Sequence, residues 1–236
     1  MAEQSTLNII ARIHSDFPTK FGIPRQSGLV EELRSTVVFE PEDRNPDALR
    51  GLEGFSHLWL IWQFSQAVRE DWSPTVRPPR LGGNTRMGVF ATRSPFRPNP
   101  IGLSCVGLAG VELHTPQGPV LRITGADLMD GTPILDIKPY LPYTDSHPEA
   151  TGGWTDSLDI PELSVCSSDD ITAKLETIFS STQIEALKEI LAQDPRPGYQ
   201  DEPNRRYGML YGGYDIRFTI SGDTLTICEV AEPGPQ

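Results

Sequence analysis

The chain has 236 residues, 37% of them hydrophobic, and a formal net charge of −12 at pH 7. This length allows one large or two small domains with a buried core. The excess of acidic residues argues against a generally basic nucleic-acid-binding protein. No stretch approaches the roughly 18 apolar residues that a membrane-spanning helix needs.

Cys105, Cys166 and Cys228 are widely spaced and form no Cys-x-x-Cys pair. This pattern argues against a disulfide framework or a cysteine-based zinc site and favours a reducing compartment. The first residues, Met1–Ser5, lack the basic and apolar regions of a secretion signal, so we expect a cytoplasmic protein. The histidines are scattered, without a His-Glu-x-x-His motif, and no metal site is expected.

The first half of the chain has the pattern of short strands. Alternating apolar residues predict a strand over Leu7–Ser15, and β-branched and aromatic residues predict another within Leu33–Glu40. The apolar run Phe55–Phe64 predicts a buried strand. Further strand-like segments are Met87–Thr92, Ile101–Leu113, Val120–Ala126 and Pro133–Ile137. Many short strands separated by Gly and Pro favour a closed or nearly closed β-barrel over a βαβ fold.

The second half of the chain begins with a change in amino-acid composition. Turn-forming residues dominate Tyr143–Pro161, which predicts a linker. Thr182 and Glu185 fit the N-cap and N3 positions of a capping box, and they predict a helix that ends before Asp194. The segment Tyr214–Val230 alternates on two arms around a Ser-Gly-Asp turn and predicts a hairpin.

A proline-rich stretch, Thr92–Leu103, is the most informative part of the chain. Proline fixes φ and lacks a backbone donor, so this stretch is neither helix nor central strand. It predicts a stiff loop that holds Arg93 and Arg97 in fixed positions, and such loops tend to bind ligands. A plain strand connection with solvated arginines is the alternative.

Charge is distributed unevenly. Residues 69–97 contain six arginines and two acidic residues, whereas residues 151–236 contain six basic and fifteen acidic residues. Because local potential decides what a cleft attracts, an arginine patch on an acidic protein can still bind phosphates. A solvated arginine-rich loop is the simpler interpretation of the composition alone.

Three more segments place polar residues in constrained backbone: Phe21–Gly28, Phe64–Gln66 and Asp127–Tyr140. In the last of these, Asp130-Gly131 is a turn dipeptide, which on its local pattern favours a simple hairpin turn. Asp127, Asp130 and Asp136 resemble a carboxylate metal cluster, but no histidine lies nearby to complete it. The chain has no G-x-S-x-G elbow, no Walker A motif and no G-x-G-x-x-G after a first strand.

Taken together, these segments resemble the TsaA-like (TrmO) family. The motif R-S-P-x-R-P-N-P-I-G-L is present as Arg93–Leu103, and D-G-T-P-x-L-D-I-K-P-Y as Asp130–Tyr140. Pro24-Arg25-Gln26, Asp194–Pro197 and Tyr207-Gly208-Met209 also match. The resemblance implies an S-adenosylmethionine-dependent methyltransferase that acts on N6 of a threonylcarbamoyl-modified adenosine beside the tRNA anticodon, works as a homodimer and binds the anticodon loop.

The family fold implied is a single-sheeted β-barrel. We therefore expect a mainly β protein with a barrel domain that carries the cofactor and catalytic residues at 1–145, a linker at 146–165 and a small α+β domain at 166–236. We expect the tRNA-docking surface in this last domain. Arg77, Arg80 and Arg86 are further candidates for contacts with the RNA backbone.

The resemblance also assigns the site. The cofactor contacts fall on Pro24, Arg25, Gln26, Ser65, Gln66, Arg93, Leu103, Leu128, Met129, Asp130, Gly131 and Thr132. Family members often have histidine at the position of Ser65. Asp136 is the expected proton acceptor, with Asn99 or Tyr140 positioning the base. Expected RNA contacts are Arg97, Arg196, Tyr199, Arg205 and Arg206.

Arg93 and Arg97 are suited to bidentate binding of carboxylate or phosphate. One would bind the cofactor carboxylate and the other the threonyl carboxylate. Three alternatives stay open from the sequence: a methyltransferase of the same fold with another substrate, a non-catalytic RNA-binding module, and a nucleotide-binding signalling protein.

Overall fold

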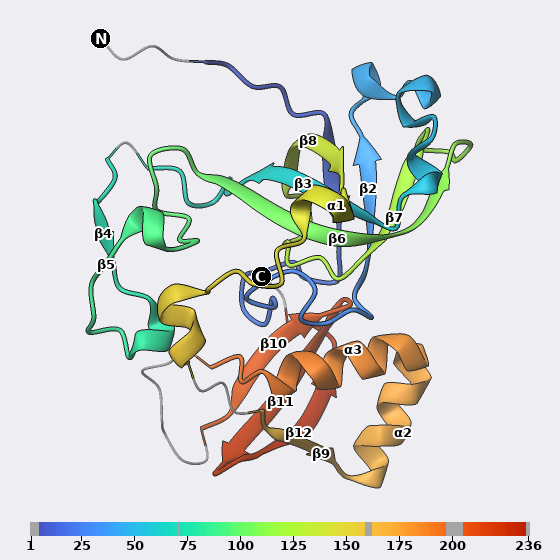
Figure 1. Ribbon diagram of the computed structural model, residues 1–236. Helices are drawn as coiled ribbons and strands as arrows, with labels where there is room; N and C mark the ends of the chain where they lie inside the picture. The colour runs from blue at the N-terminus through green and yellow to red at the C-terminus, as the bar shows by residue number, and fades with distance from the viewer. Residues whose placement is uncertain (1–4, 70, 159–161, 197–204, 235–236) are drawn as a thin grey trace.

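The computed structural model describes residues 5–69, 71–158, 162–196 and 205–234. Within these residues, a closed six-stranded barrel and a four-stranded sheet with two helices form the main bodies. Figure 1 shows the barrel in the upper part of the molecule and the C-terminal sheet below it. The predicted mainly β fold class, with an N-terminal barrel and a small α+β C-terminal part, is confirmed.

Six antiparallel strands close the barrel. In order around it they are β1 (Ala11–His14), β2 (Arg34–Phe39), β7 (Val120–Thr124), β6 (Ile101–Glu112), β3 (His57–Gln63) and β8 (Pro133–Pro139). Leu58, Leu60 and Trp62 of β3 are buried and fill the interior, so the intervening residues of β3 face outward. Three 3₁₀ turns, η1 (Pro41–Asp43), η2 (Pro46–Leu49) and η3 (Leu52–Gly54), connect β2 to β3.

The C-terminal sheet has the order β10 (Tyr207–Tyr211), β11 (Tyr214–Ser221), β12 (Thr224–Ala231) and β9 (Ser164–Ser167). The predicted hairpin is confirmed as β11 and β12, which pair antiparallel, whereas β9 pairs parallel to β12. Helices α2 (Asp169–Ile178) and α3 (Ser181–Ala192) lie on one face of the sheet (Figure 1).

The chain between β1 and β2 leaves the barrel and enters the C-terminal core. Phe17, Val30 and Leu33 are buried there with residues of α2, α3 and the sheet. The ring of Phe17 lies 5.7 Å from that of Tyr211, centroid to centroid, and the Gly212 amide donates to the Asp16 carbonyl at 2.9 Å. The segment that connects β1 to β2 of the barrel is therefore anchored in the core of the C-terminal sheet.

A long excursion separates β3 from β6. It contains a two-stranded ribbon, β4 (Thr75–Val76) and β5 (Met87–Gly88), with η4 (Pro79–Leu81) and η5 (Val89–Ala91). After the barrel come α1 (Pro142–Asp145) and η6 (Gly153–Ser157). The indole Nε1 of Trp154 in η6 donates to the Ala91 carbonyl at 2.9 Å, which ties this segment to the excursion beside it (Figure 1).

Local structure differs from the expectations in four places. Of the strand expected over Met87–Thr92, only Met87–Gly88 is a strand, and the 3₁₀ turn η5 follows it. The first strand begins at Ala11 rather than Leu7, because the backbone bonds to β8 and to the end of β2 begin at Ile10. The capping box of α3 uses Ser180 and Gln183 rather than Thr182 and Glu185. Strand β9 begins at Ser164, inside the expected linker.

Asp130-Gly131 is not the turn of a hairpin, because its flanking strands do not pair with each other. Strand β7 pairs with β2 and β6, and β8 pairs with β3 and β1. The turn instead folds back onto the start of the chain, where the Gly131 amide donates to the Ile13 carbonyl at 2.8 Å.

We predict that Gly22→Ala destabilises the protein more than Gly51→Ala. Both glycines have positive φ, +91° and +85°, so both substitutions strain the backbone by about 1–3 kcal/mol. At Gly22 an added Cβ would also lie 1.9 Å from Sδ of the buried Met209, whereas nothing lies within 4 Å at Gly51. Overpacking adds about 1–3 kcal/mol to the loss in free energy of unfolding, measured by urea denaturation. Equal losses for the two variants would contradict this packing constraint.

Candidate functional site

A cavity of about 640 Å³ lies where β3, the proline loop and the turn before β8 meet. Its volume is typical of sites for small ligands. Ten residues that the sequence predicts to bind a cofactor line it: Pro24, Arg25, Gln26, Ser65, Gln66, Arg93, Leu103, Leu128, Met129 and Thr132. Apolar surface from Trp62, Phe64 and Ile101 completes the walls. Segments far apart in sequence therefore converge on one chamber.

Hydrogen bonds hold the two arginine-bearing loops together. Arg93 donates from Nη1 to Oε1 of Gln26, and Gln26 donates from Nε2 to the Arg25 carbonyl. Arg25 in turn donates to the Arg196 carbonyl at 3.4 Å. This chain links the proline loop, the Pro24–Gln26 segment and the C-terminal part of the protein.

The proline loop is braced from within. Arg97 lines the same cavity, is half-buried, and donates from Nη2 to the Thr92 carbonyl at 3.3 Å. The Thr92 hydroxyl donates to the Val89 carbonyl at 2.8 Å. Both guanidinium groups of the loop are thus placed at the cavity by backbone that prolines and side-chain hydrogen bonds fix.

Asp127 is the carboxylate in the cavity wall. The Ser104 hydroxyl donates to its Oδ1 at 2.6 Å, and the indole Nε1 of Trp62 donates to the Ser104 oxygen at 3.0 Å. Burial raises the pKa of Asp127, although the hydrogen bond from Ser104 and the charge of Arg93 act in the opposite direction. A carboxylate with a raised pKa is a stronger base than an exposed one, and the hydrogen-bond chain fixes its orientation, so Asp127 is a candidate proton acceptor.

Asp130 and Gly131 are the two expected cofactor residues that do not line the cavity. Oδ1 of Asp130 accepts from the Ser15 amide at 3.1 Å and lies 3.2 Å from Nδ1 of His14. The Gly131 carbonyl accepts from Arg12 at 3.1 Å. In this arrangement both residues fix the turn against β1, so that its neighbours Leu128, Met129 and Thr132 face the chamber.

The three expected catalytic residues lie outside the lining of this cavity. Asp136 pairs with Lys138 at 2.9 Å, its side chain is 47% exposed, and its partner across the sheet is the outward-facing Ile61. Tyr140 packs on the rings of His57 and Trp59, near the start of β3, about 20 Å along the strand from its cavity end. Asn99 is exposed. Their catalytic roles stay predictions.

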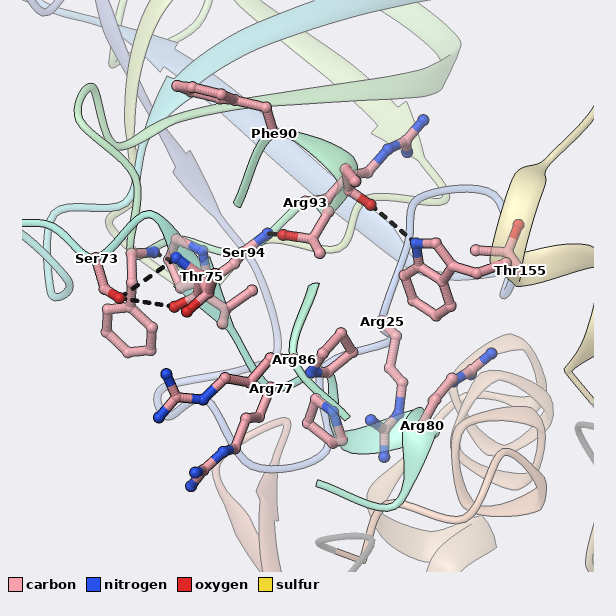
Figure 2. Close-up of a pocket in the computed structure, with 18 of the residues that line it drawn as sticks. Arg25, Ser73, Thr75, Arg77, Arg80, Arg86, Phe90, Arg93, Ser94 and Thr155 are labelled. Carbon is pink, nitrogen blue, oxygen red and sulfur yellow. Dashed lines mark hydrogen bonds between the residues drawn. The ribbon is translucent and has the colours of Figure 1, made fainter. Parts of the chain in front are cut away.

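A second, larger cavity of about 1260 Å³ adjoins the first. It lies between the β4–β5 excursion and η6, and both cavities are lined by Arg25, Gln26, Arg93, Pro95 and Phe96. Figure 2 shows Arg25, Arg77, Arg80, Arg86 and Arg93 around this second chamber. The two chambers therefore share a wall that carries two arginines.

The residues of the C-terminal part that we expect to bind RNA interact with different partners within the protein. Arg196 forms an ion pair with Asp194 at 2.7 Å, Arg206 pairs with Glu229, and the Arg205 guanidinium lies 5.5 Å from the Tyr207 ring centroid. Tyr199 lies outside the described residues. Among the residues described, no group of three or more His, Cys, Asp or Glu side chains is arranged to hold a metal, and no helix is long and apolar enough to cross a membrane.

Comparison with known proteins places these features in context. Residues 12–146 match the family described as tRNA-methyltransferase O N-terminal domain, and residues 161–233 match the TrmO C-terminal domain. The chain is 43% identical over 216 residues to the tRNA (adenine(37)-N6)-methyltransferase of Escherichia coli strain K12, covering 90% of this chain and 92% of that protein.

A relative from Pseudomonas aeruginosa PAO1 is 43% identical over 227 residues, which cover 94% of this chain and 96% of that protein. Its name contains the words "S-adenosylmethionine-dependent methyltransferase". A crystal structure titled as TrmO from the same species superposes with a TM-score of 0.79 at 36% identity, covering 99% of both chains.

We predict that Asp127→Asn becomes relatively more stable than the wild type as pH rises. The pKa of Asp127 is raised in the folded protein, so the folded state binds this proton more tightly than the unfolded chain does. The stability that this group contributes is therefore greatest at acid pH and is lost as pH rises through its raised pKa. Denaturant unfolding between about pH 4 and pH 8 measures the trend, with Asp136→Asn as the control for loss of one charge. A trend of opposite sign would contradict the burial of this carboxylate.

Proposed function

This chain belongs to the tRNA-methyltransferase O family, and we propose that it transfers a methyl group from S-adenosylmethionine to N6 of adenosine 37 in tRNA. Similarity to relatives named for this activity extends over nearly the whole chain. The observation that carries the proposal is the convergence of the arginine, glutamine and turn residues on one cavity that adjoins a basic chamber.

The residues of the smaller cavity fit the proposed cofactor. Trp62, Phe64 and Leu128 offer apolar surface for its adenine and methylene parts, and Arg93 with Gln26 offers donors for its carboxylate. Asp127 supplies the negative charge that suits its cationic groups. When bound, S-adenosylmethionine supplies an electrophilic methyl group on a sulfonium, so the protein itself needs no nucleophile.

The chain's own residues orient the cofactor and the acceptor base, and one of them accepts the proton. Arg93, held by Gln26, would hold the carboxylate of the cofactor, and the proline loop would orient the acceptor base beside it. Binding in fixed orientation lowers the barrier of such bimolecular steps by several kcal/mol. Asp127 would accept the proton that leaves N6 when the methyl group is transferred.

We extend the proposal to substrate and assembly. The adenosine carries a threonylcarbamoyl group, whose carboxylate Arg97 binds, and Arg196, Tyr199, Arg205 and Arg206 contact the rest of the tRNA. The protein works as a homodimer in the cytoplasm. The free thiols of Cys105, Cys166 and Cys228 agree with a reducing compartment.

Methyl transfer to defined tRNAs tests the function. We expect transfer of labelled methyl from S-adenosylmethionine to tRNA that carries threonylcarbamoyl-adenosine, and almost none to the unmodified tRNA. Nucleoside mass spectrometry locates the methyl group. Equal transfer to both tRNAs would refute the substrate. Saturable cofactor binding by calorimetry without transfer to either tRNA would instead point to another substrate. Absence of both would favour a non-catalytic RNA-binding module.

The catalytic carboxylate is tested by a matched pair of variants. We expect Asp127→Asn to lower kcat by about 100-fold or more, because general-base assistance typically contributes about 10²–10⁴ in rate. Asp136→Asn, which removes an exposed carboxylate, keeps kcat within about twofold of the wild type. Initial rates at saturating tRNA and cofactor measure both values. The reverse order would assign proton transfer to Asp136.

A further inference from the structure

The larger chamber concentrates positive charge on an acidic protein. Among the residues that the structure describes, its lining contains one acidic residue, Asp71, and these arginines: Arg25, Arg69, Arg77, Arg80, Arg86 and Arg93. The protein as a whole has a net charge of −12. The charge that lines the chamber is therefore opposite in sign to the net charge of the molecule. Clefts lined by charges of one sign attract ligands of the opposite charge.

Four of these arginines form no ion pair within the part of the chain that the structure describes. Among the described residues, no ion pair is made by Arg69, Arg77, Arg80 or Arg86, whereas Arg12, Arg50, Arg122 and Arg217 all have one. The pKa of Arg80 is lowered by burial and by the charge of Arg25, a sign that like charges are held close together. An anion in the chamber would relieve this repulsion.

Two of the arginines are placed together by the β4–β5 ribbon. Val76 pairs with Met87, so Arg77 and Arg86 leave the ribbon as neighbours on opposite strands. Figure 2 shows both side chains extending to the same side of the chamber. Like charges facing each other across a two-stranded ribbon destabilise it. The repulsion between Arg77 and Arg86 is relieved when both bind a phosphate backbone.

Aromatic rings stand among the arginines. Phe90 is 74% exposed and Trp72 is 48% exposed, with ring centroids 6.0 Å apart. The Arg69 guanidinium lies 3.9 Å from the centroid of the Phe96 ring. Exposed rings between cationic side chains are the pattern of surfaces that stack unpaired bases while holding their phosphates.

The chamber also opens beside the cofactor cavity. Arg25, Arg93 and Phe96 line both. A nucleotide strand bound in the larger chamber thus lies next to the wall behind which the methyl donor would lie. A base that is unstacked from such a strand would lie next to the smaller cavity, beside the shared residues.

We propose that this basic–aromatic chamber, built by the β4–β5 excursion and η6, binds the single-stranded loop of the RNA substrate. Its arginines take the phosphates and its aromatic rings stack the unpaired bases. The identity of the RNA as an anticodon loop rests on the proposed function. The C-terminal Arg206 is a weaker candidate for this role, because Glu229 already neutralises it.

Fluorescence anisotropy with a labelled, unmodified anticodon stem-loop tests the chamber without any need for methyl transfer. We expect the double variant Arg77→Gln/Arg86→Gln to weaken binding about tenfold or more. The slope of log K against log salt falls by about 1.4, since each lost contact to a single strand contributes about 0.7. Phe90→Ala weakens binding about fivefold or more through lost stacking.

Matched controls separate this effect from general loss of charge or fold. Arg34→Gln/Arg50→Gln removes two exposed arginines outside both chambers and keeps binding within about twofold. Calorimetry with S-adenosylmethionine reports the integrity of the neighbouring cavity in each variant. Unchanged binding in Arg77→Gln/Arg86→Gln, or equal affinity for a fully paired duplex, would overturn the proposal. Inactivity of the wild type in methyl transfer would leave this binding test intact.

Discussion

Phe17, Val30 and Leu33 come from the chain between two barrel strands, yet they are buried in the core of the C-terminal sheet. The Pro24–Gln26 loop spans the interval between these anchors. The same segment holds the turn before β8, because the Asp130 amide donates to the Phe17 carbonyl at 2.8 Å. The described residues that line the smaller cavity all precede residue 133, but two of its walls depend on a core made largely by residues after 162.

Positive charge is unevenly distributed over the protein, and the net charge of the chain does not show this. Acidic side chains neutralise arginines over the barrel and the C-terminal sheet, as Glu112 does for Arg122 and Glu229 for Arg206. The excursion after β3 lacks such neutralisation within the described residues, and its arginines converge with Arg25 and Arg93. The acidic balance of the rest of the chain therefore increases the contrast with this arginine-rich region, which attracts anions.

Patterns that depend on near neighbours were predictable from the sequence. The buried strand β3, the hairpin of β11 and β12, and the rigidity of the proline loop follow from local alternation and from fixed φ. Ten positions that the family resemblance assigns to the cofactor line one cavity, and their contact with a cofactor stays a prediction. What the sequence missed is non-local. Asp127 is held in the cavity wall by Ser104 and, behind it, Trp62, and Asp130 forms contacts with β1.

The anchoring of the segment before β2 has a consequence for synthesis of the chain on the ribosome. The barrel can close once β8 has emerged, but the Pro24–Gln26 loop lacks its support until Met209 and Tyr211 are made and packed. Domains generally fold as units in the order of their translation. A nascent or truncated polypeptide therefore carries all the motifs that line the cavity without the C-terminal packing that supports the Pro24–Gln26 loop.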